Sequence, residues 1–189
     1  KKPKLKEDGR VDYYSILEIP NVEKGQLIAR KISATKGEAG FTVTGETLAA
    51  KDGRDLPMKV GKNVVFDPES QGVYALIDGQ VSMLGDQINV FPVFEVNGDL
   101  DLSVGNIDFI GNVVIRGNVP AGFSVKAKGD IRITGGVEGV ELDAGGSITI
   151  SSGITAGNKG LSKAKGDIRT SFIIKGKVEA GGSVIVTQS

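Results

Sequence analysis

Two aspartates in equivalent sequence settings are the residues of this chain that could carry out a reaction. Asp130 and Asp167 occupy the same position in two copies of the heptapeptide Lys-Ala-Lys-Gly-Asp-Ile-Arg, which begins at Lys126 and again at Lys163. Carboxylates about 6.5–9.5 Å apart hydrolyse glycosidic bonds in inverting enzymes. If the two aspartates are two stacked strands apart, we expect roughly 10 Å between them. A polysaccharide-active enzyme is therefore the weakest hypothesis, because Gly-Asp pairs are also ordinary turn residues.

The composition removes most other chemistry. The 189 residues include no histidine and no cysteine, so the usual general base, metal ligand and thiol nucleophile are missing. The 23 basic and 23 acidic residues balance, so no net charge attracts nucleic acid or an anionic membrane. No apolar run reaches the roughly 18 residues of a membrane span. We predict no catalytic residues, cofactor or metal, and no binding of nucleic acid or insertion into a membrane.

The spacing of the glycines predicts the strands and turns that position the two aspartates. Residues 98–189 hold 18 of the 28 glycines, and five of these recur at spacings of 18, 17, 20 and 16 residues. These anchor glycines are Gly111, Gly129, Gly146, Gly166 and Gly182. Around them, small or aliphatic residues occupy every second position, which indicates strands with one buried face. The pattern predicts a parallel β-helix of about five rungs, and the unequal rung lengths favour a right-handed one.

A third buried position is expected in each rung, four residues beyond the alternating pair. Val137, Ile154 and Ile174 occupy it in three successive rungs. We also expect glycine to serve at the corners because it adopts positive φ easily.

Charged residues on the outer surface of the predicted rungs follow a pattern of their own. Four of the rungs have an alanine two residues before the anchor glycine, and the position before that alanine alternates in sign from rung to rung. At the position before the anchor glycine, and at the one after the turn, cations are separated by uncharged rungs. Opposite charges on strands about 4.8 Å apart attract, so a solvated face that maintains register explains the pattern. A face that docks an acidic partner is the functional alternative. The candidate interaction face comprises Lys126, Lys128, Arg132, Asp143, Lys163, Lys165, Arg169 and Glu179.

Residues 1–97 lack this repeat and are predicted to form a small β-barrel or β-sandwich, with the domain boundary near Asn97-Gly98. Asp78-Gly79 predicts a tight hairpin between strands at 73–77 and 80–84. We expect a short helix or edge strand at 13–17 and a disordered basic tail at 1–6. The domain is expected to cover the open start of the β-helix, where unpaired strand edges would promote aggregation. The fold class is therefore all-β throughout.

Several of these stretches together resemble one bacterial family, the flagellar assembly protein A family, over nearly the whole chain. They are Ile19-Pro20-Asn21-Val22-Glu23-Lys24-Gly25, Asp78-Gly79-Gln80-Val81, Asn97-Gly98-Asp99-Leu100-Asp101 and Gly105-Asn106-Ile107-Asp108-Phe109. The β-helix part is also similar to bactofilins and to the C-terminal domain of MinC. The resemblance implies a barrel-like domain followed by a right-handed β-helix, and a role in polar flagellation. It also implies a phosphotransferase-system component, the glucose-specific one, as a protein partner.

Three hypotheses about function remain. The first is a non-enzymatic scaffold or regulator in the cytoplasm, recruited to the cell pole, which acts through protein–protein contacts in flagellar assembly or placement. The second is self-association into filaments, as in bactofilins, through the last rung at 184–186. The third is the polysaccharide-active enzyme. The chain does not begin with Met, so we expect it to be part of a longer protein.

Overall fold

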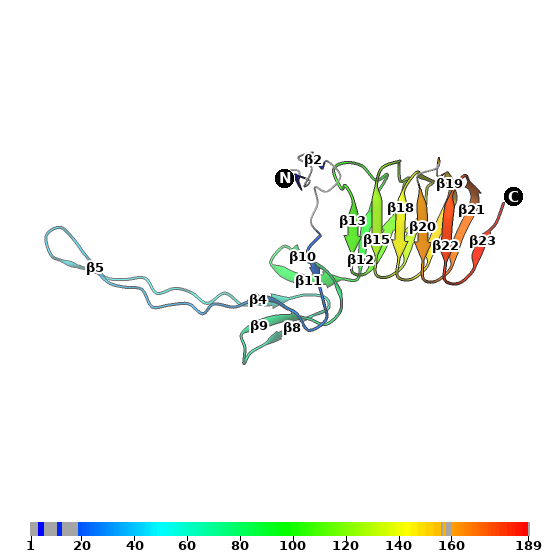
Figure 1. Ribbon diagram of the computed structural model, residues 1–189. Coiled ribbons are helices and arrows are strands. Elements are labelled where there is room, and N and C mark those ends of the chain that lie inside the picture. Colours follow the sequence, from blue (N-terminus) through cyan, green and yellow to red (C-terminus); the bar gives the residue numbers. More distant parts are fainter. Residues whose placement is uncertain (1–3, 6–10, 13–18, 156, 158–159, 189) are drawn as a thin grey trace.

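The computed structural model describes residues 4–5, 11–12, 19–155, 157 and 160–188. These residues form strands and turns with no helix, which confirms the all-β prediction. A strand-rich N-terminal region is followed by a solenoid of parallel strands (Figure 1). The element expected at 13–17 lies outside the described residues, as does most of the expected tail. The described part of that tail, β1 (Lys4–Leu5), pairs with β2 (Val11–Asp12).

The solenoid consists of about five turns whose strands stack in parallel on two main sides. One sheet has the order β13 (Ile107–Phe109), β15 (Ser124–Ala127), β18 (Glu141–Ala144), β20 (Leu161–Ala164) and β22 (Lys177–Ala180). The other sheet has the order β12 (Val93–Val96), β14 (Asn112–Ile115), β16 (Ile131–Ile133), β19 (Ile148–Thr155), β21 (Ile168–Ile174) and β23 (Val184–Val186). The ladder thus begins at Val93, and the boundary placed near residue 97 remains a prediction.

The predicted alternation of buried and exposed residues places the core inside these turns. Val125 stacks on Leu142, and Ile131 on Ile148, and these four side chains are at most 1% exposed. Ser162 and Thr170 replace aliphatic residues in two of the buried columns, and no buried side-chain N or O atom among the described residues lacks a hydrogen-bond partner. Each turn therefore buries its inner face only by stacking on its neighbours.

The five anchor glycines lie in register, as predicted. The reason that these positions require glycine differs from the one expected. Backbone hydrogen bonds of 2.9–3.0 Å link each of them to the next. None of the five has a positive φ, so the expectation that glycine is needed there for a positive φ was wrong. The reason is instead close approach: a Cβ on Gly129 would lie 2.1 Å from Asn112 Oδ1, and one on Gly146 would lie 2.1 Å from Asp130 Oδ1.

The third buried position was assigned correctly in two rungs and wrongly in the next. Val137 pairs with Ile154, but Ile154 pairs with Ile173 rather than Ile174. The register shifts between β19 and β21, where β19 has one residue more. Ile174 is consequently 49% exposed. The shift lies at Gly153, where an added Cβ would come within 2.4 Å of the Phe172 ring.

The N-terminal region contains two small sheets that share a core. One has the order β3 (Asn21–Val22), β10 (Gly79–Leu84), β11 (Gln87–Phe91) and β7 (Lys59–Val60). The other has the order β4 (Leu27–Arg30), β9 (Gly72–Ala75) and β8 (Val64–Asp67). Their shared core comprises Val22, Val64, Val73, Ala75, Ile88 and Val90.

The hairpin predicted at Asp78-Gly79 does not form. β9 pairs with β4 and β8, whereas β10 pairs with β11 and β3, so the chain passes from one sheet to the other at Asp78. Gly79 has no positive φ, which a two-residue hairpin turn of this type requires. Its role is close packing, since an added Cβ would lie 2.3 Å from the Phe91 carbonyl oxygen. The actual hairpin turn is at Gly85, whose φ is 62°.

A long arm leaves the N-terminal region between β4 and β7, and no sequence pattern indicated it. Residues 31–58 run outward and back, and near the tip β5 (Gly40–Phe41) pairs with β6 (Thr47–Leu48) (Figure 1). Most of its larger apolar side chains reach no core: Phe41 is 71% exposed and Leu56 80%, and Met58 packs on the N-terminal core only where the arm returns. The arm therefore contributes little to the stability of the rest of the fold.

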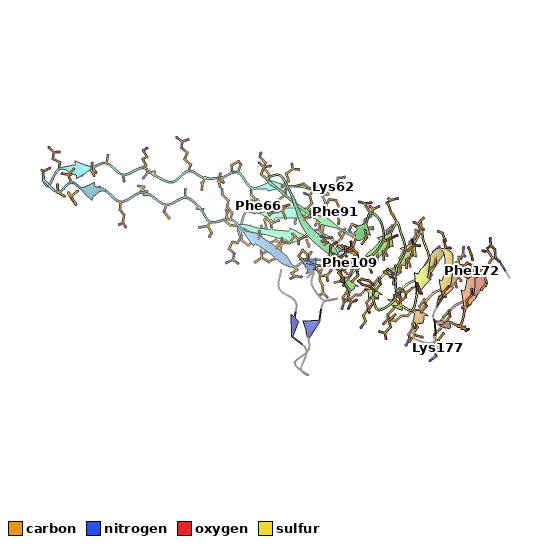
Figure 2. The ribbon with its side chains drawn as sticks, turned by 90° about the horizontal axis from the view of Figure 1, so that it is seen from above. Lys62, Phe66, Phe91, Phe109, Phe172 and Lys177 are labelled. Atoms are coloured by element: carbon orange, nitrogen blue, oxygen red, sulfur yellow. The ribbon has the colours of Figure 1, made fainter. Side chains whose placement is uncertain are left out.

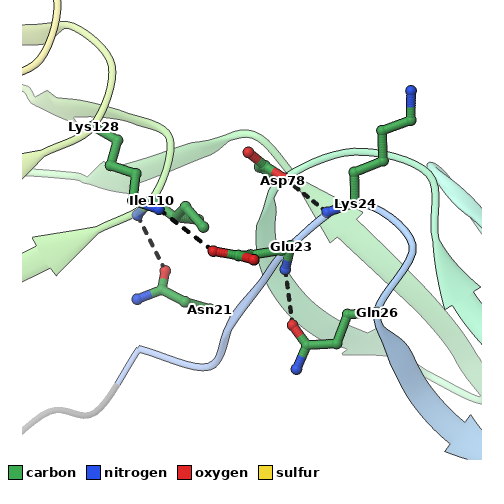
Figure 3. A network of polar contacts seen from close by, with 7 residues as sticks. All are labelled: Asn21, Glu23, Lys24, Gln26, Asp78, Ile110 and Lys128. Carbon is green, nitrogen blue, oxygen red and sulfur yellow. Dashed lines mark hydrogen bonds and ion pairs between the residues drawn. The ribbon is translucent and has the colours of Figure 1, made fainter.

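Polar contacts join the N-terminal region to the first turn of the solenoid (Figure 3). The Asn21 side chain donates a hydrogen bond to the Asp108 carbonyl (3.1 Å) and accepts one from the Ile110 amide (3.3 Å). Lys128 lies 3.5 Å from Glu23. The Lys24 amide donates to Asp78 (2.7 Å), which fixes the loop beside this junction.

The two ends of the solenoid differ. At the start, Phe94 and Phe109 are buried with their ring centroids 5.9 Å apart, and Leu100 is 1% exposed. Figure 2 shows Phe109 next to the N-terminal region and Lys177 near the opposite end. In the last described turn, Val184 and Val186 are 46% and 45% exposed. The first turn is therefore covered, and the last turn exposes its apolar column.

Candidate functional site

The alternating charges predicted from the repeat lie in one straight column on the outer face of the sheet that runs from β13 to β22. Backbone pairing places each residue directly beside the next. The column has one member more than the sequence alignment found, because Ile107-Asp108-Phe109 alternates like the later strands. We call this the charge column: Asp108, Lys126, Asp143, Lys163 and Glu179.

A second column lies beside the first, at the corner where the chain leaves this sheet. We call it the corner column: Ile110, Lys128, Gly145, Lys165 and Gly181. The glycines leave gaps between the lysines, and a shallow hollow spans both columns. Its lining comprises Asp108, Lys126, Ala127, Lys128, Asp143, Gly145 and Lys165.

The remaining two predicted residues are on the other sheet. Arg132 and Arg169 flank Thr149, and Ile185 follows Arg169, as the alignment predicted. The structure therefore brings six of the eight candidate residues together and separates these two arginines from them. Whether any of the eight binds a partner remains a prediction.

Local ion pairs engage some of these charges. Glu179 lies 2.9 Å from Lys177 on its own strand, and the Lys177 hydrogen bond and charge, together with Lys163, lower the pKa of the Glu179 carboxyl. Arg169 lies 3.9 Å from Asp167. In the described part of the chain, Lys126, Lys163 and Lys165 have no carboxylate within 4.0 Å. These three ammonium groups are therefore available to another molecule.

Asp130 and Asp167 belong to a third column, whose side chains accept hydrogen bonds from backbone amides. We call it the turn column: Asn112, Asp130, Ser147, Asp167 and Ser183. In it, each side-chain oxygen accepts a hydrogen bond from the amide of the following member. Asp130 accepts from the Ser147 amide (2.7 Å), and Asp167 from the Ser183 amide (2.9 Å). One turn separates the two aspartates, and each already has a structural partner.

We predict that replacement of Asp130 will distinguish this backbone role from a catalytic one. Asp130→Asn keeps an acceptor oxygen, as Asn112 does one turn earlier, and should cost less than about 1 kcal/mol. Asp130→Ala leaves the Ser147 amide without this acceptor and should cost about 1–3 kcal/mol. Urea unfolding of the three proteins measures both values. Equal stability of the Ala and Asn variants would contradict the role of the turn column.

In residues 19–155 and the remaining described positions, no three His, Cys, Asp or Glu side chains come together in a way that could hold a metal ion. A second hollow includes Phe123, Glu138 and Glu141 in its lining. No helix that could cross a membrane occurs in the described segments.

Comparison with known proteins gives the family. No curated protein and no solved structure matches the chain. Residues 1–86 match the family model described as the Flagellar Assembly Protein A N-terminal region. Residues 92–189 match the model described as the Flagellar Assembly Protein A beta solenoid domain. The two models meet where the N-terminal sheets give way to the parallel ladder, so this chain belongs to the flagellar assembly protein A family.

Proposed function

We propose that this chain is a non-enzymatic cytoplasmic scaffold or regulator of flagellar assembly or placement. One observation carries the proposal: a stacked backbone keeps exposed charges of alternating sign in straight columns, while the aspartates suited to catalysis bind backbone amides. A solenoid of this kind offers an extended, preformed surface whose side chains need little reordering when a partner binds. The family is named for flagellar assembly rather than for a reaction, which also supports this proposal.

The partner we propose is the glucose-specific phosphotransferase component that the family resemblance implies. It would bind at the unpaired cations, and protein contacts recruit the scaffold to the cell pole. The columns suit an acidic surface because Lys126 and Lys163 are separated by one turn, as are Lys128 and Lys165. Binding of this kind weakens with salt, since the groups are exposed.

Binding of the purified component to the immobilised chain tests the proposal. Lys126→Glu/Lys163→Glu should weaken binding at least about tenfold if the charge column is the site. Arg132→Glu/Arg169→Glu tests the other sheet in the same way. Lys36→Glu/Lys51→Glu on the arm, with the same change of net charge, is the matched control. If the component does not bind, it is not the partner. If all variants bind it equally, neither charged surface is the binding site.

A second candidate function is end-to-end assembly through the last described turn, which the exposure of Val184 and Val186 favours. The covered first turn opposes head-to-tail stacking, because Phe94 and Leu100 are already buried there. Electron micrographs and light scattering over a hundredfold concentration range test it. Filaments, or pairs joined through their last turns, that disappear with Val184→Lys would establish assembly through this end, and particles of constant monomer mass would exclude it.

A further inference from the structure

We propose that two copies of this chain pair side by side through the sheet that runs from β13 to β22, with their solenoid axes pointing in opposite directions. The scaffold role does not require a second copy, so this inference goes beyond the proposed function. It rests on a symmetry in the charge column that becomes visible only when Asp108 is included.

The first four charges of the column are complementary to their own reversed order. Asp108, Lys126, Asp143 and Lys163 read minus, plus, minus, plus, and their reversal reads plus, minus, plus, minus. A closed pair of identical chains needs a two-fold axis, and an axis perpendicular to the stacking direction reverses the column of one copy against that of the other. Placed parallel to the strands and midway between β15 and β18, it sets Lys126 opposite Asp143 of the second copy. It also sets Asp108 opposite Lys163 of the second copy.

The corner column fits the same axis. It sets Lys128 opposite Gly145 of the second copy, which has no side chain, and Lys165 opposite Ile110 of the second copy. Lys128, Gly145 and the central charges already line one hollow. On the other flank, Ser124 would face Glu141 of the second copy. No two like charges face each other among these positions.

The spacing of the charges selects a second copy over other partners. Stacked strands repeat at about 4.8 Å in both copies, so four pairs match without accumulated error. A helix with alternating charges every 3.5 residues advances about 5.3 Å for each charge, so its charges drift out of alignment along the column. Figure 1 shows β13, β15, β18, β20 and β22 side by side on one open face of the solenoid.

Sedimentation of the full chain at low salt, over a hundredfold concentration range, tests the pairing. We expect a reversible dimer that dissociates as salt is added. Lys126→Glu and Asp143→Lys should each weaken it at least about tenfold, because the two-fold axis turns two attractive contacts into two repulsive ones. Lys51→Glu on the arm, with the same change of charge as Lys126→Glu, should leave the dimer unchanged.

The decisive step is a mixture of the two weakened variants. In a mixed pair, the new carboxylate at position 126 of one chain would face the new ammonium group at position 143 of the other. The second contact remains native, so dimers should return. The double variant Lys126→Glu/Asp143→Lys should also pair, although its own neighbouring charges no longer alternate. A monomer at every concentration, or a mixture that stays monomeric, would overturn the proposal. Neither result measures partner binding by the monomer. The scaffold proposal is therefore decided by the binding experiment described above and not by this one.

Discussion

Ile148→Ala should lower the free energy of unfolding by about 2–5 kcal/mol, the range for removing a large aliphatic side chain from a full core. Ile148 is 0% exposed and lies between Ile131 and Ile168 in adjacent turns. The cavity would open in the middle of a continuous column, where both neighbours lose contacts and the stacked backbone limits collapse. Urea unfolding followed by circular dichroism measures the loss.

Val184→Ala is the matched control for this substitution. Val184 continues the same column two turns further on, but it is 46% exposed. Its truncation should cost less than about 1 kcal/mol, because little buried contact is lost. If both substitutions cost the same, the core would not be the continuous column described above.

Gly145→Ala should destabilise the solenoid by about 1–3 kcal/mol although it adds only one methyl group. The new Cβ would lie 2.1 Å from the Lys128 carbonyl oxygen, which is backbone and cannot rotate away. Relief requires β15 and β18 to separate, which strains the hydrogen bond from the Gly145 amide to Ala127 (2.9 Å). Thermal unfolding of the variant measures the effect.

Gly136→Ala provides the comparison, since the nearest atom to its added Cβ would be 3.7 Å away and its φ is not positive. This variant should lie within about 0.5 kcal/mol of the parent, or gain up to about 1 kcal/mol from a stiffer unfolded chain. Equal destabilisation by both alanines would show that loss of glycine flexibility, rather than close approach of adjacent turns, explains the glycines of the solenoid.

The sequence by itself determined the solenoid and its register, because those features repeat. Alternation of buried and exposed residues, an anchor glycine in each turn and charges of alternating sign all follow from one constraint, the stacking of equivalent positions about 4.8 Å apart. Alignment of the copies therefore predicted which residues pair, such as Lys126 with Asp143. It also predicted that Asp130 and Asp167 occupy equivalent positions, which the turn column confirms.

Only the tertiary structure decided what does not repeat. A bulge of one residue in β19 moved Ile173 inward in place of Ile174, since register depends on pairing and not on spacing along one chain. The turn at Asp78 became a passage between two sheets because β9 pairs with β8 and β4, whereas β10 pairs with β11 and β3. The arm at 31–58 has no buried face, so it carries no hydrophobic period from which to predict it. The charged residues are divided between two sheets because the chain changes direction at the corners of each turn. The spacing of residues along the chain does not determine that direction, so the division could not be predicted.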